Sequence, residues 1–395
     1  MAITISEITA SSTHLSGNPI KVKATTSAIP SGATEYMILL KIVSVDDVLF
    51  GGPFVSAIAP DASLEAEFEI SGWVNQEIEK DLTWPIPDVY GSRWHGFESL
   101  AYDVQLVPGE RYIDSNGDLV ETYGSTWGTL FIVSGQLNEY LLAKLNSASS
   151  SWYAWYCTGG RWFSFMPLSQ KVNAYQPVKL WWKSPADGAY VLKVKGYYTD
   201  GSTETYTGNP DLYVGVLFES DVNPADCGLT ISSATKRLTY YEVWMEGTPN
   251  VETRTFVIDW TYHEENWYLF TDNEIGGIEC IWLSGAVKYQ PSASRSVSKR
   301  PQRSGEGIKQ RTRYVAAKSL RRWTINTGFK PRAEMEALLM LLDSEYMWLA
   351  IPPEGGSTDI SLYTLTPVLV TSSELPLFDN SADLFSIDIE FEEAY

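Results

Sequence analysis

The sequence predicts a mainly β protein, in which several β-sandwich domains are followed by a C-terminal α+β module of the order β-α-β-β-β. Three observations lead to this prediction. The 395 residues are enough for a few domains of roughly 100–200 residues each. Short alternating or continuous apolar runs recur between turns rich in Gly, Pro and Asn, which is typical of sandwiches. The chain also holds 15 Trp, 23 Tyr and 14 Phe, whereas disordered chains are poor in aromatic residues.

Residues 1–90 are expected to form an immunoglobulin- or fibronectin-like β-sandwich. Alternating apolar residues at 20–24 and 64–70 indicate half-buried strands. The near-continuous apolar run at 36–43 indicates a central strand that is buried on both faces. The segment 81–95 contains two Pro and has no clear period, so the first domain boundary is placed there.

Residues 96–287 are expected to form a central, aromatic-rich β body, which could be two sandwiches separated near the Ser-rich segment 147–151. The sequence Asp-Ser-Asn-Gly-Asp at 114–118 predicts a hairpin turn, because Asn-Gly supplies the positive φ angles that a tight turn needs. Asp-Gly at 200–201 predicts a second hairpin. A stripe of three Leu within 136–146 indicates a short helix.

Positive charge is concentrated in one segment of an acidic chain. The net charge is −20, yet residues 288–322 contain eleven Lys or Arg and one acidic residue, so this segment carries +10 and the remainder −30. Residues 288–312 hold almost no large apolar side chains and cannot bury enough surface to order themselves. We therefore predict a basic extended linker or arm over 288–312. Its candidate interaction residues are Arg295, Lys299, Arg300, Arg303 and Lys309, followed by Arg311 and Arg313.

Three interpretations of this basic segment remain open. It could be a solvated linker, or an arm that docks on the acidic surface of a neighbouring copy or partner, or a contact to nucleic acid. The acidic body argues against nucleic acid as a partner, because phosphate contacts need a basic face. No nucleic-acid partner is therefore expected.

Residues 313–395 are expected to form the α+β module. The pattern predicts a strand at 318–329 and a helix at 331–343, with Pro at its first position and an apolar stripe along one face. Strands are expected at 346–351 and 362–371. Alternation of apolar and acidic residues at 385–392 predicts a half-buried last strand.

No catalytic constellation is recognisable. The three histidines lack metal-ligand spacing, the three cysteines are scattered, and neither a nucleophile elbow nor a phosphate loop is present. A non-enzymatic protein without cofactor or metal is therefore expected, although a pair of carboxylates in a sugar cleft stays open. The oxygen-rich segment 114–121 has part of the spacing of a calcium loop, but a polar hairpin turn is favoured because its Gly is misplaced.

Five tryptophans of the central body have three possible roles. They could fill sandwich cores, bury an interface with another protein, or stack on sugar rings, since an indole offers a large rigid face and one N–H donor. These candidates are Trp152, Trp155, Trp162, Trp181 and Trp182.

Two features bear on location. The first residues lack the basic and apolar regions of a signal peptide, and no apolar run approaches the ~20 residues that span a bilayer. Synthesis in the cytoplasm without membrane insertion is therefore expected.

The C-terminal residues resemble the ends of tail proteins from phages and prophages of Bacteroidetes-type hosts. The likeness is carried by Trp323 to Phe329, Leu338-Leu339 with Ser344, Met347 to Leu349, Pro367 to Thr371, and Leu384 to Glu393. This pattern is similar to distal-tail and baseplate structural proteins, and the N-terminal module loosely resembles sandwich domains that are joined to them.

The resemblance implies a structural component of a virion tail or baseplate. Such a component forms rings or trimers, contacts other tail proteins, and connects the tail to receptor-binding elements. The alternative is a carbohydrate-binding protein that recognises host glycans through exposed Trp residues.

Overall fold

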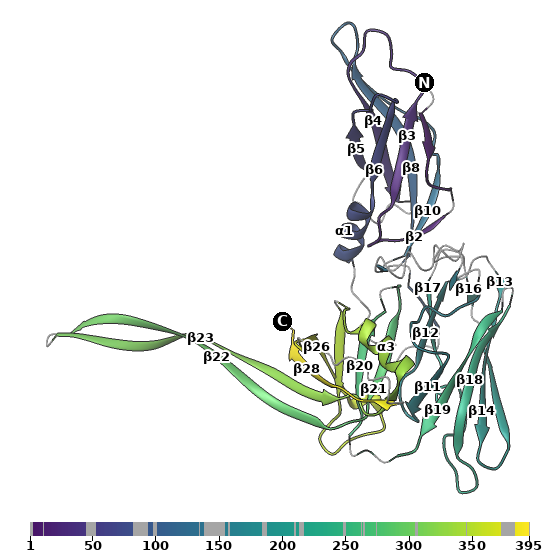
Figure 1. Ribbon diagram of the computed structural model, residues 1–395, viewed down its shortest axis with the longest axis vertical. Coiled ribbons are helices and arrows are strands. Elements are labelled where there is room, and N and C mark those ends of the chain that lie inside the picture. Colours follow the sequence, from purple (N-terminus) through teal and green to yellow (C-terminus); the bar gives the residue numbers. More distant parts are fainter. Residues whose placement is uncertain are drawn as a thin grey trace. The chain divides into compact units, whose positions relative to one another are not determined.

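A computed structural model shows a mainly β chain (Figure 1). The structure describes residues 3–10, 12–44, 53–81, 94–97, 101–133, 135–137, 155–156, 159–183, 188–208, 211–212, 217–247, 250–261, 263, 265–273, 275–304, 307–344, 346–372 and 384–394. The chain divides into two compact units. Unit 1 comprises 1–165, 178–255 and 273–278, and unit 2 comprises 166–177, 256–272 and 279–395. The expected boundaries at 90–96 and at 287–313 therefore do not separate the compact parts.

The N-terminal sandwich in unit 1 is larger than predicted. Its first sheet contains β1 (Ile3–Ser6), β3 (Lys21–Thr26) and β6 (Glu65–Glu69). Its second sheet has the order β2-β10-β8-β4-β5, with β9 paired to β8. The bounds are Thr13–Leu15 for β2, Thr34–Ser44 for β4, Phe54–Ile58 for β5, Ala101–Ile113 for β8, Leu119–Tyr123 for β9 and Gly128–Val133 for β10.

The expected end of this domain near residue 90 is wrong because β4 needs a partner from beyond it. Strand β4 pairs with β8 from Thr34↔Ile113 to Ser44↔Val104. Buried residues of both sheets form one core, among them Val22, Ile38 and Phe68. The turn at 114–118 joins β8 to β9 and confirms the predicted hairpin.

A helix that the sequence analysis missed, α1 (Ser71–Asp81), follows β6. The carboxylate of Glu69 accepts hydrogen bonds from the backbone N–H groups of Ile20 and Ser71, at 2.9 and 3.0 Å. Val74 lies one turn beyond Ile70, and both are fully buried.

The central residues form three further sheets. One has the order β11-β19-β18-β14-β15, a second β12-β17-β7, and a third pairs β13 with β16. The predicted hairpin at 200–201 is confirmed by the pairing of β14 with β15. The bounds are Trp94–Phe97 for β7, Ser169–Asn173 for β11, Lys179–Lys183 for β12, Gly188–Ala189 for β13, Val191–Tyr198 for β14, Thr203–Gly208 for β15, Asp211–Leu212 for β16, Leu217–Asp221 for β17, Leu238–Glu246 for β18 and Val251–Asp259 for β19. Most of the helix expected at 136–146 lies outside the described residues.

Unit 2 is organised around a sheet of the order β21-β20-β25-β26-β28-β23-β22. Helix α3 (Arg332–Leu341) follows Pro331 and buries Met335, Leu338 and Leu341. The short strands β24 (Lys330–Pro331) and β27 (Leu384–Phe385) pair beside it, and η3 (Ile360–Leu362) precedes β26. The bounds of the sheet strands are Trp267–Asp272 for β20, Ile278–Leu283 for β21, Val287–Ser304 for β22, Gly307–Asn326 for β23, Met347–Ile351 for β25, Thr364–Val370 for β26 and Asp388–Glu393 for β28.

Two strands from the expected central body belong to this sheet. All six residues of β20 are buried, and this strand pairs with β25 from Tyr268↔Ala350 to Thr271↔Met347. A strand that is apolar on both faces requires cover on both faces and a neighbour on each side. The prediction that a separate C-terminal module begins at 313 is therefore wrong.

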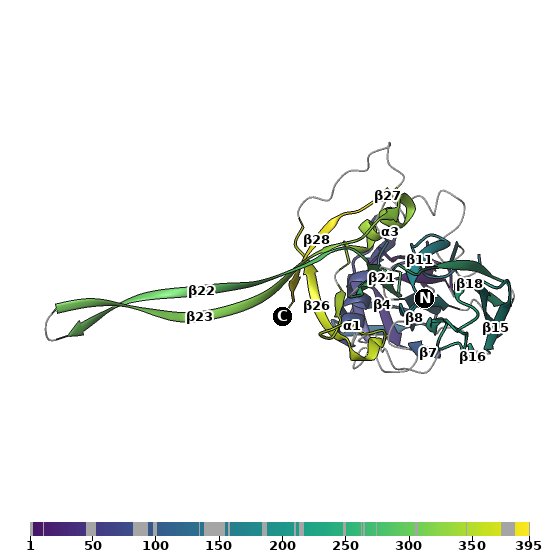
Figure 2. The ribbon, with the colours of Figure 1, turned by 90° about the horizontal axis from the view of Figure 1, so that it is seen from below.

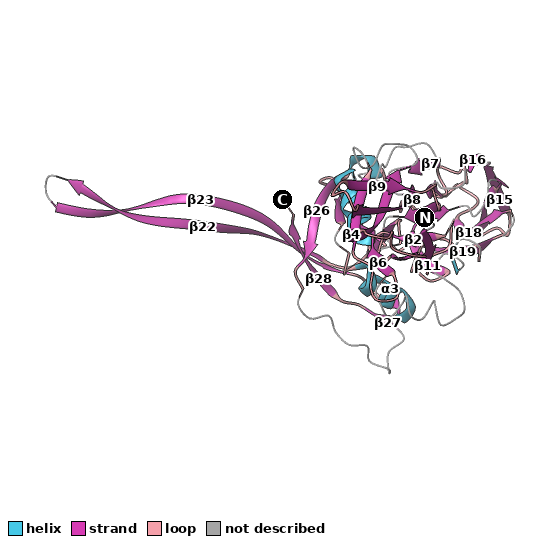
Figure 3. Cartoon of the chain, turned by 90° about the horizontal axis from the view of Figure 1, so that it is seen from above, coloured by secondary structure: helices cyan, strands magenta, loops and turns pink. Residues whose placement is uncertain are grey.

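The predicted linker or arm at 288–312 lies in an antiparallel hairpin of β22 and β23. Its register runs from Val287↔Ile325 to Ser304↔Gly307, with an irregularity after Ser296. Near its base β23 also pairs with β28, up to Arg322↔Glu392. The two strands continue past this pairing as a two-stranded ribbon (Figures 2 and 3). The segment is ordered although it buries little apolar surface, because each strand supplies the backbone hydrogen-bonding partner of the other.

Candidate functional site

The β22–β23 hairpin carries all seven basic candidates from the sequence. Their partners by register are Ala317 for Arg295, Thr312 for Lys299, Arg311 for Arg300, Ile308 for Arg303, Gln302 for Lys309, and Ser298 for Arg313. Residues that lie opposite one another, and residues two apart on one strand, share a face of the ribbon. We call the part beyond the pairing with β28, residues 291–304 and 307–321, the outer hairpin. By register, one of its faces includes Arg300, Lys309, Arg311 and Arg313.

This arrangement is unfavourable for a hairpin in isolation. Like charges that lie directly opposite are destabilising in an antiparallel pair, and Arg300 lies directly opposite Arg311. A two-stranded ribbon is at best marginally stable in water. The outer hairpin therefore combines like charges in register with a two-stranded backbone that has little support of its own.

At the base of the hairpin, two basic residues of β23 pair with acidic residues of the neighbouring strand β28. Arg322 Nε donates to Glu392 Oε2 at 2.7 Å, and Arg321 Nε lies 3.7 Å from Glu393 Oε2. Both acids belong to β28, whose alternating acidic residues the sequence predicted. Pairing with this acidic strand ends at Arg322, while β22 and β23 continue outward together.

The free edge of β22 is protected against indiscriminate strand pairing. This strand is the last in the order of its sheet, and it contains Pro291 and Pro301. Proline lacks the backbone N–H and is tolerated chiefly in edge strands, where it blocks uncontrolled association. Charged side chains along an edge have the same effect. We therefore expect the faces and the basic residues to direct recognition by this hairpin.

The tryptophan candidates are divided by burial. Trp162, Trp181 and Trp182 are 0 to 1% exposed, so the hypothesis that they stack on glycans is wrong. Trp162 Nε1 donates to the Glu252 carbonyl at 3.0 Å, and Trp181 Nε1 donates to the Ile278 carbonyl at 3.1 Å. Sandwich cores need large side chains, and the burial of these indoles fulfils that need.

The other two tryptophans have different outcomes. Trp155 is half-buried, and its ring lies beneath the Arg161 guanidinium, 3.8 Å from ring centroid to Cζ. This cation–π contact covers a ring face that stacking on a sugar would need. Trp152 lies outside the described residues.

The described residues contain no cluster of metal ligands, and two of the three cysteines lie among them. No group of three His, Cys, Asp or Glu that could hold a metal lies in this part of the chain. The Asp114 carboxylate accepts from the backbone N–H groups of Asn116 and Asp118, at 2.8 and 2.9 Å, and these bonds lower its pKa. The segment is a hairpin turn, as the favoured interpretation predicted. Cys227 is buried, Cys280 is partly exposed, and Cys157 lies outside the described residues.

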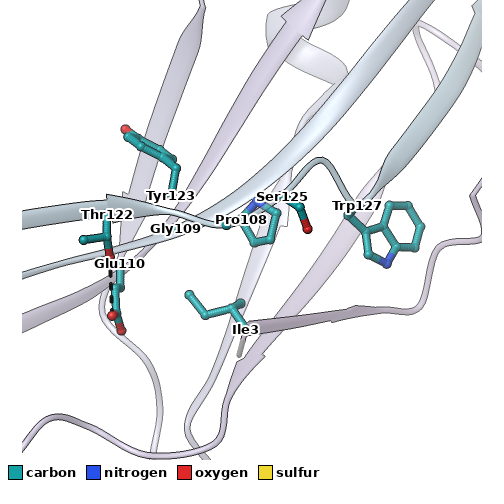
Figure 4. A pocket seen from close by; sticks show the side chains of 9 residues that line it. Ile3, Pro108, Gly109, Glu110, Thr122, Tyr123, Ser125 and Trp127 are labelled. Carbon is teal, nitrogen blue, oxygen red and sulfur yellow. Dashed lines mark hydrogen bonds between the residues drawn. The ribbon is translucent and has the colours of Figure 1, made fainter. Parts of the chain in front are cut away.

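One feature was missed by the sequence analysis. A groove of about 580 Å³ opens in the N-terminal sandwich between β1 and the β8–β9 hairpin. The buried carboxylate of Glu110 faces it together with Thr122 (Figure 4). The sequence could have indicated Glu110, because this residue continues the alternating inward-facing positions Val104, Leu106 and Pro108 along β8.

No protein-family model matches the chain, and no curated protein has a similar sequence at a significant level. None of the helices in the described residues is long and apolar enough to cross a membrane.

Proposed function

We propose that this chain is a non-enzymatic structural component of a phage tail or baseplate, which assembles with its own copies and with other tail proteins. The observation that carries the proposal is the basic two-stranded β22–β23 hairpin that extends from the sheet of unit 2. In an assembled particle it acts as an arm that grips a neighbour. The resemblance of the C-terminal residues to distal-tail and baseplate proteins supports the same assignment.

Charge complementarity identifies the kind of surface that the hairpin contacts. Residues 288–322 carry +10 and the remainder of the chain −30, so a second copy of the chain offers an acidic partner. The contact between Arg322 and Glu392 provides a template for such pairing within one chain. Opposite potentials steer association and fix the register of the two surfaces.

The geometry of an arm favours a closed assembly. A hairpin that docks on a different surface of the next copy makes a head-to-tail contact, and repeated contacts of this kind close into a ring when the rotation permits. A ring or trimer at the tail end, with receptor-binding elements attached to it, follows from such closure. The carbohydrate-binding alternative loses support in the central body, because Trp162, Trp181 and Trp182 are core residues.

The first experiment measures mass in solution for the full chain and for a chain with a shortened hairpin. Removing residues 294–318 and joining Ala293 to Ser319 through Asn-Gly keeps the register at the base, because these two residues are direct partners. We expect the full chain to form a defined oligomer that weakens as ionic strength rises. The shortened chain should remain folded and monomeric.

A charge-matched pair of variants separates recognition from a general effect of charge. Arg300→Gln with Arg311→Gln alters the hairpin, whereas Lys21→Gln with Arg332→Gln removes two exposed charges elsewhere. Only the hairpin pair should weaken assembly. The proposal would be contradicted if the full chain stayed monomeric at high concentration, or if the oligomer survived removal of the hairpin. It would also be contradicted if mass spectrometry did not find the chain in purified phage particles.

A further inference from the structure

The groove of the N-terminal sandwich lies where its two sheets part. Figure 4 places Glu110 and Thr122 at one end and Trp127 at the other, with Ile3 and Pro108 between them. Ile3 comes from β1 in the smaller sheet, and the other residues come from the larger sheet and the segment before β10. The remaining lining residues are Gly109, Tyr123, Gly124 and Ser125.

Glu110 occupies an inward-facing position of β8, where sandwich domains normally have an apolar residue. Along β8, Val104 and Leu106 point into the core and are fully buried, and Glu110 continues this alternation. Its direct partner in β4 is Ile38, which is also fully buried. Glu110 itself is only 9% exposed. A charged side chain at such a position lowers stability unless its oxygens are well supplied with donors.

The donors inside the protein only partly supply this carboxylate. Tyr36 Oη donates to Glu110 Oε2 at 2.9 Å, and Thr122 Oγ1 donates to Glu110 Oε1 at 3.4 Å, a long contact. Burial and the Glu110 carboxylate raise the pKa of Tyr36 to about 12, so its hydroxyl keeps its proton. A carboxylate can accept about four hydrogen bonds, and in the described residues Glu110 forms no ion pair with Lys or Arg. Glu110 therefore has acceptor capacity directed to the groove.

The rest of the groove wall combines apolar surface with hydroxyl groups. Trp127 is half-buried and packs against the sandwich core, while Ile3 and Pro108 supply aliphatic surface. Thr122 and Ser125 are exposed at the rim. Ligand sites combine mostly apolar walls with a few placed polar groups and have volumes of roughly 300–1,000 Å³, a range that includes this groove.

We propose that this groove binds a neutral saccharide. The Glu110 carboxylate accepts hydrogen bonds from sugar hydroxyls, the C–H face of a pyranose ring packs on Trp127, and the hydroxyls of Thr122 and Ser125 contact the ligand at the rim. An anionic ligand is disfavoured by Glu110. A lysine side chain would satisfy the carboxylate but would leave the rim hydroxyls and the aliphatic wall without a role.

Ligand-observed NMR on the full chain tests this inference. The probes are lactose, cellobiose, maltose and diacetylchitobiose, with a lysine-rich peptide as the competing class. We expect saturation transfer from the protein to at least one saccharide, and at least a tenfold loss of affinity in Glu110→Gln. The matched control is Glu67→Gln, because Glu67 is exposed on β6 of the same sandwich and pairs with Lys21, and neither residue lines the groove. Its affinity should equal that of the unaltered chain.

A second variant separates ligand binding from a structural role of the carboxylate. Glu110→Leu restores the apolar pattern of β8, and Tyr36 Oη keeps Thr26 Oγ1 as a partner at 3.2 Å. We expect this variant to abolish binding while its melting temperature stays equal or rises, as residues kept for function commonly lower stability. The inference is overturned by the absence of transfer to every saccharide, by unchanged binding in Glu110→Gln, by binding of the lysine-rich peptide alone, or by a large drop in melting temperature in Glu110→Leu. The hairpin-shortened chain should bind the saccharide normally, so this result is independent of assembly.

Discussion

Arg300 and Arg311 are direct cross-strand partners in the β22–β23 hairpin. Replacing one of them by an acid should strengthen the hairpin itself, because opposite charges in such a pair stabilise by about 0.2–1 kcal/mol. The same change should weaken docking on an acidic neighbour. For Arg311→Glu we therefore expect slower amide exchange in the outer hairpin of the monomer and a smaller assembled mass. Unchanged assembly would contradict the role given to this basic face.

Glu204 should control the acid stability of unit 1. It accepts hydrogen bonds from Tyr198 Oη at 2.6 Å and from the Thr230 backbone N–H at 2.8 Å, and it pairs with the Lys236 ammonium. The Lys236 contact and these bonds lower the pKa of Glu204 from 4.5 to about 2. Because the folded-state pKa is the lower one, this contribution is complete above pH 4.5 and is lost as the pH falls through about 2.

Urea unfolding between pH 5 and pH 2 measures this effect. Glu204→Gln should lower stability near neutral pH by about 2 kcal/mol, since it removes hydrogen bonds to a charged acceptor, and it should flatten the acid dependence. Glu67→Gln is the control, because Glu67 forms only an exposed ion pair with Lys21 and such pairs contribute little. An equal acid dependence in all three proteins would exclude Glu204 as the cause.

Gly277 leaves room for the buried ring of Trp181. A Cβ atom at Gly277 would lie 2.7 Å from Trp181 Cγ, so Gly277→Ala should destabilise unit 1 by about 1–3 kcal/mol through overpacking. At Gly72 in α1, a Cβ atom meets nothing within 4 Å. Gly72→Ala should therefore stabilise by up to about 1 kcal/mol, because Ala favours the helix. Thermal unfolding checks the opposite signs, and a shift of the same sign in both variants would refute the packing argument.

Lys330 and Glu334 form a buried pair at the start of α3. Lys330 Nζ lies 3.9 Å from Glu334 Oε2, and both side chains are less than a tenth exposed. Burial lowers the pKa of Lys330 and raises the pKa of Glu334. Glu334→Ala should cost about 3–5 kcal/mol because it leaves a buried charge without its partner, whereas Lys330→Met with Glu334→Leu should recover most of this loss. Denaturant unfolding of the single and double variants decides between these outcomes, and a double variant as unstable as the single one would contradict the explanation.

Local features of the structure could be predicted from short stretches of sequence. The turns at 114–118 and 200–201 join β8 to β9 and β14 to β15, where Asn-Gly or Asp-Gly sets the backbone. The apolar stripe after Pro331 lies on the buried face of α3. These features depend on residues close together in the chain, where propensity and periodicity act directly. The basic character of the hairpin was equally visible.

The grouping of strands could not be predicted in this way. Strand β8 completes the sheet of β4, and β20 completes the sheet of β25, although each lies on the other side of an apparent boundary in the sequence. The segment 288–312 was predicted to be an extended linker or arm because its own side chains bury little, but that pattern did not indicate that β22 and β23 pair with each other. The selection of a strand's neighbour depends on non-local burial and on backbone groups, and neither is encoded in one stretch of residues.

Residue type and spacing are enough to predict the mainly β class, the local turns, the helix of unit 2 and the separation of charge along the chain. The folded chain was needed to show that three candidate tryptophans are core residues, that Arg300 and Arg311 are cross-strand partners by register, and that the carboxylate of Glu110 faces a groove. Burial and cross-strand register arise only when distant segments pack together. A side chain's chemistry is fixed by its identity, but its exposure and its neighbours are properties of the folded chain.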